Sequence, residues 1–145
     1  MPAWVEAGFD EYARRMTKEM PLELLQVRPE ARAGGMPIER LTAAEAKRVR
    51  GALPTGCYKV VLDEHGQSCT TKALAKRFED WQMGGVDVAF VIGGPDGLDP
   101  SIRREADWLW SLSSLTLPHA LVRVVVAEQL YRAASILKNH PYHRD

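Results

Sequence analysis

The stretch Val86-Asp87-Val88-Ala89-Phe90-Val91-Ile92-Gly93-Gly94-Pro95-Asp96-Gly97 decides the fold class. Its first seven residues are mostly apolar and rich in β-branched side chains, which is typical of a strand buried in a parallel sheet. Ligands bind such sheets beyond the carboxyl ends of the strands, so the glycines that follow predict either a loop that approaches a ligand or a plain turn. The Lys-Ser/Thr pair of a phosphate-binding loop is missing, which excludes that motif.

Strands and helices alternate on both sides of this stretch, which indicates an α/β class with a mostly parallel sheet. Pro29, Gly34 and Gly35 predict a loop over residues 28–37, and residues 65–68 read as a turn. We expect strands over residues 22–27, 58–63, 86–92 and 108–112, and helices over residues 3–16, 38–51, 99–106 and 120–138, with one more from Thr70 or Thr71 to Gly84-Gly85.

Length and composition limit the class of protein. A chain of 145 residues with 46% apolar and 26% charged residues predicts one globular domain over residues 1–145. No run of about 18 uncharged apolar residues exists, so no spanning helix or membrane partner is expected, and Glu6 follows the start too soon for a secretory peptide. Cys57 and Cys69 lie far apart, which favours two reduced thiols in a cytosolic chain.

Charge is balanced at 19 basic and 19 acidic residues. This balance argues against a protein coated in positive potential for general nucleic-acid binding, and it leaves room for a local basic site.

The last expected helix is apolar nearly all round, which predicts burial on more than one side, either in the core or in a subunit interface. Glu128 and Arg132 are four residues apart and are expected to pair, with a site role left open for Arg132. The preceding loop, Leu115-Thr116-Leu117-Pro118-His119, is interpreted either as the wall of a pocket or as simple packing.

The tail over residues 140–145 begins His140-Pro141-Tyr142-His143-Arg144, which is dense in groups that do chemistry. Histidine exchanges protons near neutral pH, tyrosine stacks on a base, and arginine holds phosphate. A solvated terminus is the alternative interpretation. No further metal ligands lie near the two histidines in sequence, so no metal is expected. The residues alone thus predict an α/β protein with a cleft formed by glycine-rich and apolar loops.

Several motifs that occur in a fixed order along the chain resemble those of a known family. Residues 90–98, 111–119 and 140–144 occur in order with Leu121-Val122-Arg123-Val124 and Ala127-Glu128-Gln129-Leu130-Tyr131-Arg132-Ala133 between them. Together they closely resemble the large-subunit ribosomal RNA methyltransferase H family of the SPOUT superfamily, over essentially the whole chain. The resemblance implies a single-domain α/β fold with a trefoil knot, which composition does not predict. It further implies a cytoplasmic homodimer packed through the knotted region.

The reaction that the resemblance implies is transfer of a methyl group from S-adenosylmethionine to N3 of a pseudouridine in 23S ribosomal RNA, within the assembled ribosome. Carried over residue by residue, the cofactor site comprises Leu62, Gly94, Ser113, Ser114, Leu115, Thr116, Leu117 and Pro118. The acceptor side comprises His119, Arg132, His140, Tyr142, His143 and Arg144. The implied roles are proton handling by His143 or His140, packing on the base by Tyr142, and binding of the anion or phosphate by Arg132 and Arg144.

One family feature has no counterpart here. Family members usually open with a short strand and a glycine turn before the helix that matches Trp4 to Met16. The resemblance therefore implies either a start codon assigned downstream or the loss of a strand. Two other functions stay open: a non-catalytic RNA-binding or ribosome-binding module of the same fold, and a knotted methyltransferase that acts on transfer RNA or a small molecule.

Overall fold

The computed structural model describes residues 1–16, 18, 20–32 and 34–144, and it divides into two compact units. The helical unit comprises Met1–Leu24, Ser68–Gly85 and Leu115–Asp145, and the sheet unit comprises Leu25–Gln67 and Val86–Ser114. Ala33 of the expected loop and Asp145 of the expected tail lie outside the described residues.

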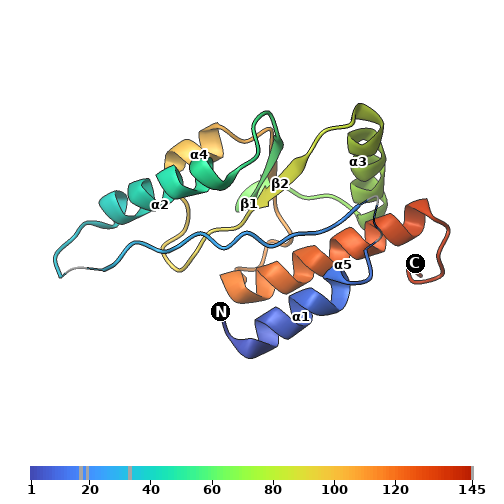
Figure 1. Ribbon diagram of the computed structural model, residues 1–145, viewed down its shortest axis with the longest axis horizontal. Helices are drawn as coiled ribbons and strands as arrows, with labels where there is room; N and C mark the ends of the chain where they lie inside the picture. Colours follow the sequence, from blue (N-terminus) through green and yellow to red (C-terminus); the bar gives the residue numbers. More distant parts are fainter. Residues whose placement is uncertain (17, 19, 33, 145) are drawn as a thin grey trace. The chain divides into compact units, whose positions relative to one another are not determined.

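A parallel sheet of three strands forms the centre of the sheet unit (Figure 1). Strands β1 (Tyr58–Gln67), β2 (Val88–Val91) and β3 (Trp108–Trp110) are ordered β2-β1-β3, and both pairings are parallel. Helices α2 (Ile38–Ala52) and α4 (Pro100–Arg104) complete the unit. Its core contains one side chain from each of α2, β1, β2 and α4, namely Ala46, Val61, Val91 and Ile102. The predicted α/β class with a parallel sheet is confirmed.

The second half of β1 differs from the prediction, because the turn expected over residues 65–68 lies largely within the strand. The strand runs on to Gln67 beside β3, where the Ser111 N–H donates to the Gln67 carbonyl at 2.9 Å. Gly66 permits this approach, since a Cβ there would lie 2.7 Å from the backbone carbonyl of Leu109. The pairing shifts register between Leu62 and Gln67, so β1 bulges before it continues.

The strand predicted over residues 22–27 is wrong, because the structure has no regular element there. The chain that follows is tied to α2 by side chains instead of a strand ladder. The Arg28 carbonyl accepts from Arg48 at 3.0 Å, and the Glu30 N–H donates to Glu45 at 3.0 Å. Strands β2 and β3 are shorter than expected, since β2 begins at Val88 and β3 ends before Leu112.

Three helices form the helical unit: α1 (Ala3–Ala13), α3 (Thr71–Gly84) and α5 (His119–Leu137). Helix α5 packs against both α1 and α3, which confirms that it is buried on more than one side. As expected, Thr70 caps α3, accepting from the Ala73 N–H at 3.1 Å, and Gly85 ends it in the left-handed conformation at φ +64°.

The fold also bears on the two cysteines and on membrane-spanning helices. Cys57 is buried and Cys69 is half-buried, and the two do not form a disulfide with each other. Among the described residues, no helix combines the length and the apolar character needed to span a bilayer.

Candidate active site

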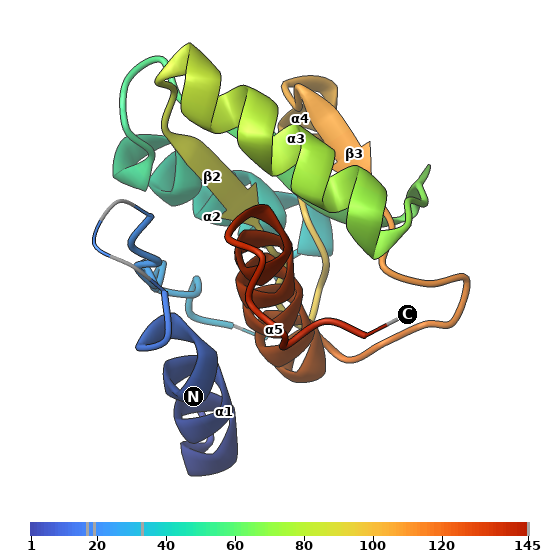
Figure 2. The ribbon, with the colours of Figure 1, turned by 90° about the vertical axis from the view of Figure 1, so that its right-hand side faces the viewer.

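The chain reverses direction at the end of α5, and the sequence there explains why. Asn139 adopts the left-handed conformation at φ +57°, which asparagine tolerates better than most residues. The His140 N–H donates to the Ser135 carbonyl at 2.8 Å, and the Asn139 N–H donates to the Ile136 carbonyl at 3.1 Å. These two bonds form a Schellman motif. Figure 2 shows the red chain after α5 turning back beside that helix.

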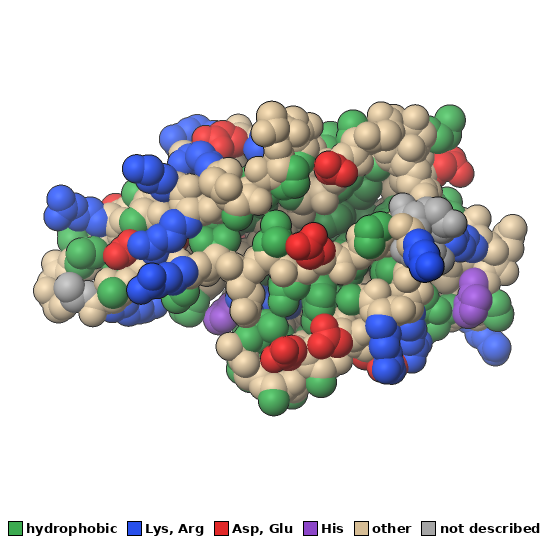
Figure 3. Space-filling view, in the orientation of Figure 1, with side chains coloured by type: hydrophobic (Ala, Val, Ile, Leu, Met, Phe, Trp, Pro, Cys, Tyr) green, Lys and Arg blue, Asp and Glu red, His purple; other side chains and the backbone are tan. Residues whose placement is uncertain are grey.

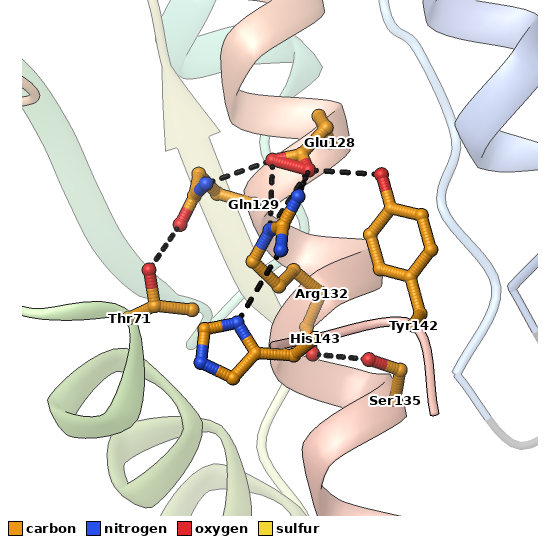
Figure 4. Close-up of polar contacts among 7 residues, drawn as sticks. All are labelled: Thr71, Glu128, Gln129, Arg132, Ser135, Tyr142 and His143. Atoms are coloured by element: carbon orange, nitrogen blue, oxygen red, sulfur yellow. Dashed lines mark hydrogen bonds and ion pairs between the residues drawn. The ribbon is translucent and has the colours of Figure 1, made fainter. Parts of the chain in front are cut away.

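Glu128 organises the polar cluster that this reversal creates (Figure 4). Its carboxylate pairs with the Arg132 guanidinium one helical turn later, at 2.9 Å, so the predicted pair is confirmed. The same carboxylate accepts from Gln129 Nε2 at 2.7 Å and from the Tyr142 hydroxyl at 3.1 Å. The Glu128 side chain is 18% exposed, and three donors therefore surround a mostly buried anion. Its contact with Arg132 raises the pKa of that guanidinium, so Arg132 stays cationic.

Tyr142 is held between α5 side chains by its ring as well as its hydroxyl. The Tyr131 ring lies 4.7 Å away at a steep angle, and the Arg132 guanidinium carbon lies 4.7 Å from the Tyr142 ring centroid. Burial and the nearby Glu128 charge raise the pKa of Tyr142 to about 12. The phenol therefore remains protonated at physiological pH and serves as a donor and a flat surface, not as a base.

Both tail histidines accept a hydrogen bond at the ring nitrogen Nδ1. Arg132 Nη1 lies 3.3 Å from His143 Nδ1, and because arginine only donates, His143 Nδ1 accepts. The Tyr142 N–H donates to His140 Nδ1 at 3.3 Å. In the neutral form each ring then carries its proton on Nε2.

Sequence reasoning missed several residues that complete this cluster. Thr71, at the start of α3, donates to Gln129 Oε1 at 2.9 Å and so links a second helix to Glu128. The Tyr12 ring of α1 lies 6.4 Å from that of Tyr131. The guanidinium carbon of Arg15, in the turn after α1, lies 5.7 Å from both rings. The sequence signal for these contacts is Gln129, a polar residue beside Glu128 on a helix rich in apolar side chains.

The structure thus brings together three of the expected acceptor-side residues, Arg132, Tyr142 and His143, with His140 at the edge. The Arg144 side chain is exposed, and it makes no hydrogen bond or ion pair within the described part of the chain. His119 does not join them, because it begins α5 thirteen positions before Arg132. At the helical rise this is a separation of about 20 Å.

The expected cofactor residues of the sheet unit lie at one edge of the sheet. Val61 pairs with Val91, the last residue of β2, and Leu62 pairs with Trp110, the last residue of β3. The loops that carry Gly94 and Ser113-Ser114 therefore leave the sheet at the level of Leu62. This is the edge where open α/β sheets bind ligands.

The glycine loop after β2 contains the turn that its sequence predicted as one of two possibilities. The Gly97 N–H donates to the Gly94 carbonyl at 3.0 Å, which forms a tight turn. A Cβ at Gly93 would contact Leu98 at 3.1 Å, so that glycine serves internal packing. A Cβ at Gly94 would meet nothing within 4 Å, so its backbone is open to a ligand.

The remaining expected cofactor residues, Leu115 to Pro118, belong to the helical unit and lead directly into α5. Leu115 is 69% exposed, and Pro118 occupies the N-cap position in an extended conformation. No group of three or more metal-ligating side chains occurs among the residues that the structure describes.

Known proteins match this chain over almost its whole length. A family model described as "Predicted SPOUT methyltransferase" matches residues 1–143. A protein of Nitrosospira multiformis named "Ribosomal RNA large subunit methyltransferase H" is 54% identical over 144 residues, which cover 99% of this chain and 92% of the relative. A protein of the same name from Burkholderia multivorans is 55% identical with the same coverage. The chain therefore belongs to the SPOUT methyltransferase family.

Proposed function

We propose that this protein transfers a methyl group from S-adenosylmethionine to the RNA of the large ribosomal subunit, at N3 of a pseudouridine in 23S RNA on assembled ribosomes in the cytoplasm. The observation that carries the proposal is the identity of 54% or more to proteins named for ribosomal RNA methylation, over almost the whole chain. The cluster of Arg132, Tyr142 and His143 supports it, because this set suits an acidic N–H of a flat base.

The residues at the sheet edge fit the cofactor. Gly94 offers open backbone, and Leu62 provides an apolar side chain at the carboxyl end of the strands. We assign the binding of the adenosyl group to these residues, together with Ser113, Ser114 and the run from Leu115 to Pro118. When bound, S-adenosylmethionine supplies an electrophilic methyl group on a sulfonium, so the chain's own task is to orient the acceptor nitrogen.

The acceptor side has to remove the N3 proton and stabilise the resulting anion. Tyr142 stays protonated because its pKa is raised to about 12, so it packs on the base or donates to it. His143 takes the proton in this proposal, once its Nδ1 is released from Arg132, and His140 is the alternative acceptor. Arg132 and Arg144 hold the anion or a phosphate.

A homodimer is part of this proposal, and distances within the helical unit support it. Pro118 and Arg132 stand at opposite ends of α5, about 20 Å apart along the helix, so one copy does not bring the cofactor run to its own tail cluster. A second copy supplies the missing half. Trp4 of α1 is 57% exposed and Leu121 of α5 is 36% exposed, which is the apolar surface that such a partner covers. The trefoil knot and a single domain over residues 1–145 belong to the same proposal, and the family match across both units supports them.

The decisive experiment uses ribosomes from a strain that lacks the gene. Purified protein and S-adenosylmethionine with an isotopically labelled methyl group are added, and the 23S RNA is digested and analysed by mass spectrometry. We expect label on one pseudouridine of 23S RNA and none on transfer RNA. Calorimetry with S-adenosylmethionine separates the main alternative, because a non-catalytic ribosome-binding module has no affinity for the cofactor.

A further inference from the structure

The balanced charge of the whole chain hides an uneven distribution inside the sheet unit. Residues 25–52, which comprise α2 and the segment before it, carry six basic and three acidic side chains. The rest of that unit carries three basic and seven acidic side chains. We term the six basic side chains the α2 basic surface; they are Arg28, Arg32, Arg40, Lys47, Arg48 and Arg50.

Two of the three acidic residues of this segment, Glu30 and Glu45, form hydrogen bonds within it, and the third, Glu39, is exposed. Glu45 accepts from the Glu30 N–H at 3.0 Å, and Glu30 in turn accepts from Arg48 at 2.7 Å. Both glutamates are half-buried, whereas all six cations of the α2 basic surface are exposed. The contacts that fasten the segment to α2 therefore remove negative charge from the surface and leave positive charge outside. Figure 3 shows Lys and Arg side chains gathered over the region where Figure 1 labels α2.

Three cations of the α2 basic surface, Arg32, Arg48 and Arg50, form ion pairs with acidic side chains. The side chains of Arg40 and Lys47, both on α2, form no ion pair or hydrogen bond within residues 1–16, 18, 20–32 and 34–144. They are seven residues apart, so they share one face of α2 at a spacing of about 10 Å. Ala43 and Gly51 lie on the same exposed face, and their small size lets a partner's backbone come close to the helix.

We infer that the α2 basic surface binds the phosphate backbone of ribosomal RNA away from the methylated nucleotide. The inference rests on the proposed function and assigns to this surface the electrostatic part of substrate recognition. Exposed cations without protein partners bind phosphates at little cost, because no internal ion pair has to be broken and condensed counterions are released from the RNA. Contacts of this kind position a protein on nucleic acid without reading its sequence.

The test is the double variant Arg40→Gln with Lys47→Gln, assayed on unmethylated ribosomes. We expect KM for ribosomes to rise about five- to tenfold, and log affinity against log salt to become shallower by about 1 to 2 units, as for two lost phosphate contacts. The value of kcat at saturating ribosomes and the affinity for S-adenosylmethionine stay at wild-type levels, because α2 carries none of the proposed reacting groups. Co-sedimentation with ribosomes measures binding independently of turnover.

The matched control is Arg14→Gln with Lys18→Gln, which removes the same charge from exposed positions of the helical unit. We expect wild-type KM for this control. Glu39→Lys, which adds positive charge beside Arg40 in α2, should lower KM. A wild-type KM in the α2 double variant, or an equal rise in the control, overturns the inference. If the wild-type protein co-sediments with ribosomes but does not methylate their RNA, the proposed function fails, and co-sedimentation of the variants still tests the α2 basic surface. If the wild-type protein does not co-sediment with ribosomes, the proposed function and this inference both fail.

Discussion

The guanidinium carbon of Arg132 lies 4.7 Å from the ring centroid of Tyr142, so a side chain of α5 packs directly on a ring of the tail. The same guanidinium pairs with Glu128 and reaches His143. Because the tail contacts α5 at three neighbouring side chains, its placement depends on the charge of Glu128 as much as on the tail's own sequence.

Removal of that charge should change the titration of the tail. In Glu128→Gln the hydroxyl of Tyr142 loses a charged acceptor, so we expect its pKa to fall from about 12 toward the ordinary value of 10. A difference titration of phenolate absorbance against Tyr142→Phe isolates this one group. An unchanged pKa would show that burial alone, the larger cause, sets the shift.

The same shift predicts how stability depends on alkaline pH. The folded-state pKa of Tyr142 lies above its unfolded value, so its stabilising contribution is complete below about pH 10 and is lost as pH rises toward 12. Urea unfolding at a series of alkaline pH values should show a steeper loss in wild type than in Tyr142→Phe. Parallel curves for the two proteins would contradict the assignment.

The tail variants His143→Ala and Arg144→Ala should lose methyl transfer while they keep the affinity for S-adenosylmethionine. The reason is that both side chains are assigned to the acceptor, not to the cofactor. Labelled methyl incorporation into 23S RNA measures the first property and calorimetry measures the second. Full turnover in both variants rejects these roles.

The reversal after α5 should depend on the left-handed residue. Asn139→Ala should destabilise the protein by about 1 kcal/mol at φ +57°. The reason is that alanine keeps the Cβ that disfavours the left-handed conformation but lacks the polar group by which asparagine bonds locally. Asn139→Gly tolerates that conformation and serves as the control, with stability close to wild type. Urea denaturation of both variants tests the pair, and an equal loss in the two would point to the asparagine side chain itself.

Two glycines of the sheet unit should respond in opposite ways. Gly66→Ala places a Cβ 2.7 Å from the Leu109 backbone, so we expect a loss of about 1–3 kcal/mol in unfolding free energy. Gly94→Ala meets no atom within 4 Å, so stability should be unchanged while S-adenosylmethionine binds more weakly. Calorimetry on the well-folded Gly94→Ala protein decides whether this backbone faces the cofactor. Wild-type affinity there would remove Gly94 from the proposed site.

Local signals in the sequence determined the class of the fold and most of its elements. The apolar run before Gly93 predicted β2, and Thr70 and Gly85 predicted the ends of α3, because caps and left-handed residues act on their immediate neighbours. The i, i+4 spacing predicted the pair of Glu128 and Arg132 for the same reason.

Contacts between distant residues were decided only by the tertiary structure. The second half of β1 exists because Gly66 fits against Leu109, forty-three positions later, and nothing beside Gly66 in the sequence shows that neighbour. Thr71 and Tyr12 join the tail cluster from two other helices. Residues 22–27, expected to form a strand, pair with no strand of the sheet. Periodicity and capping report the residue's own segment, whereas side-chain partners are set by which surfaces meet once the chain packs.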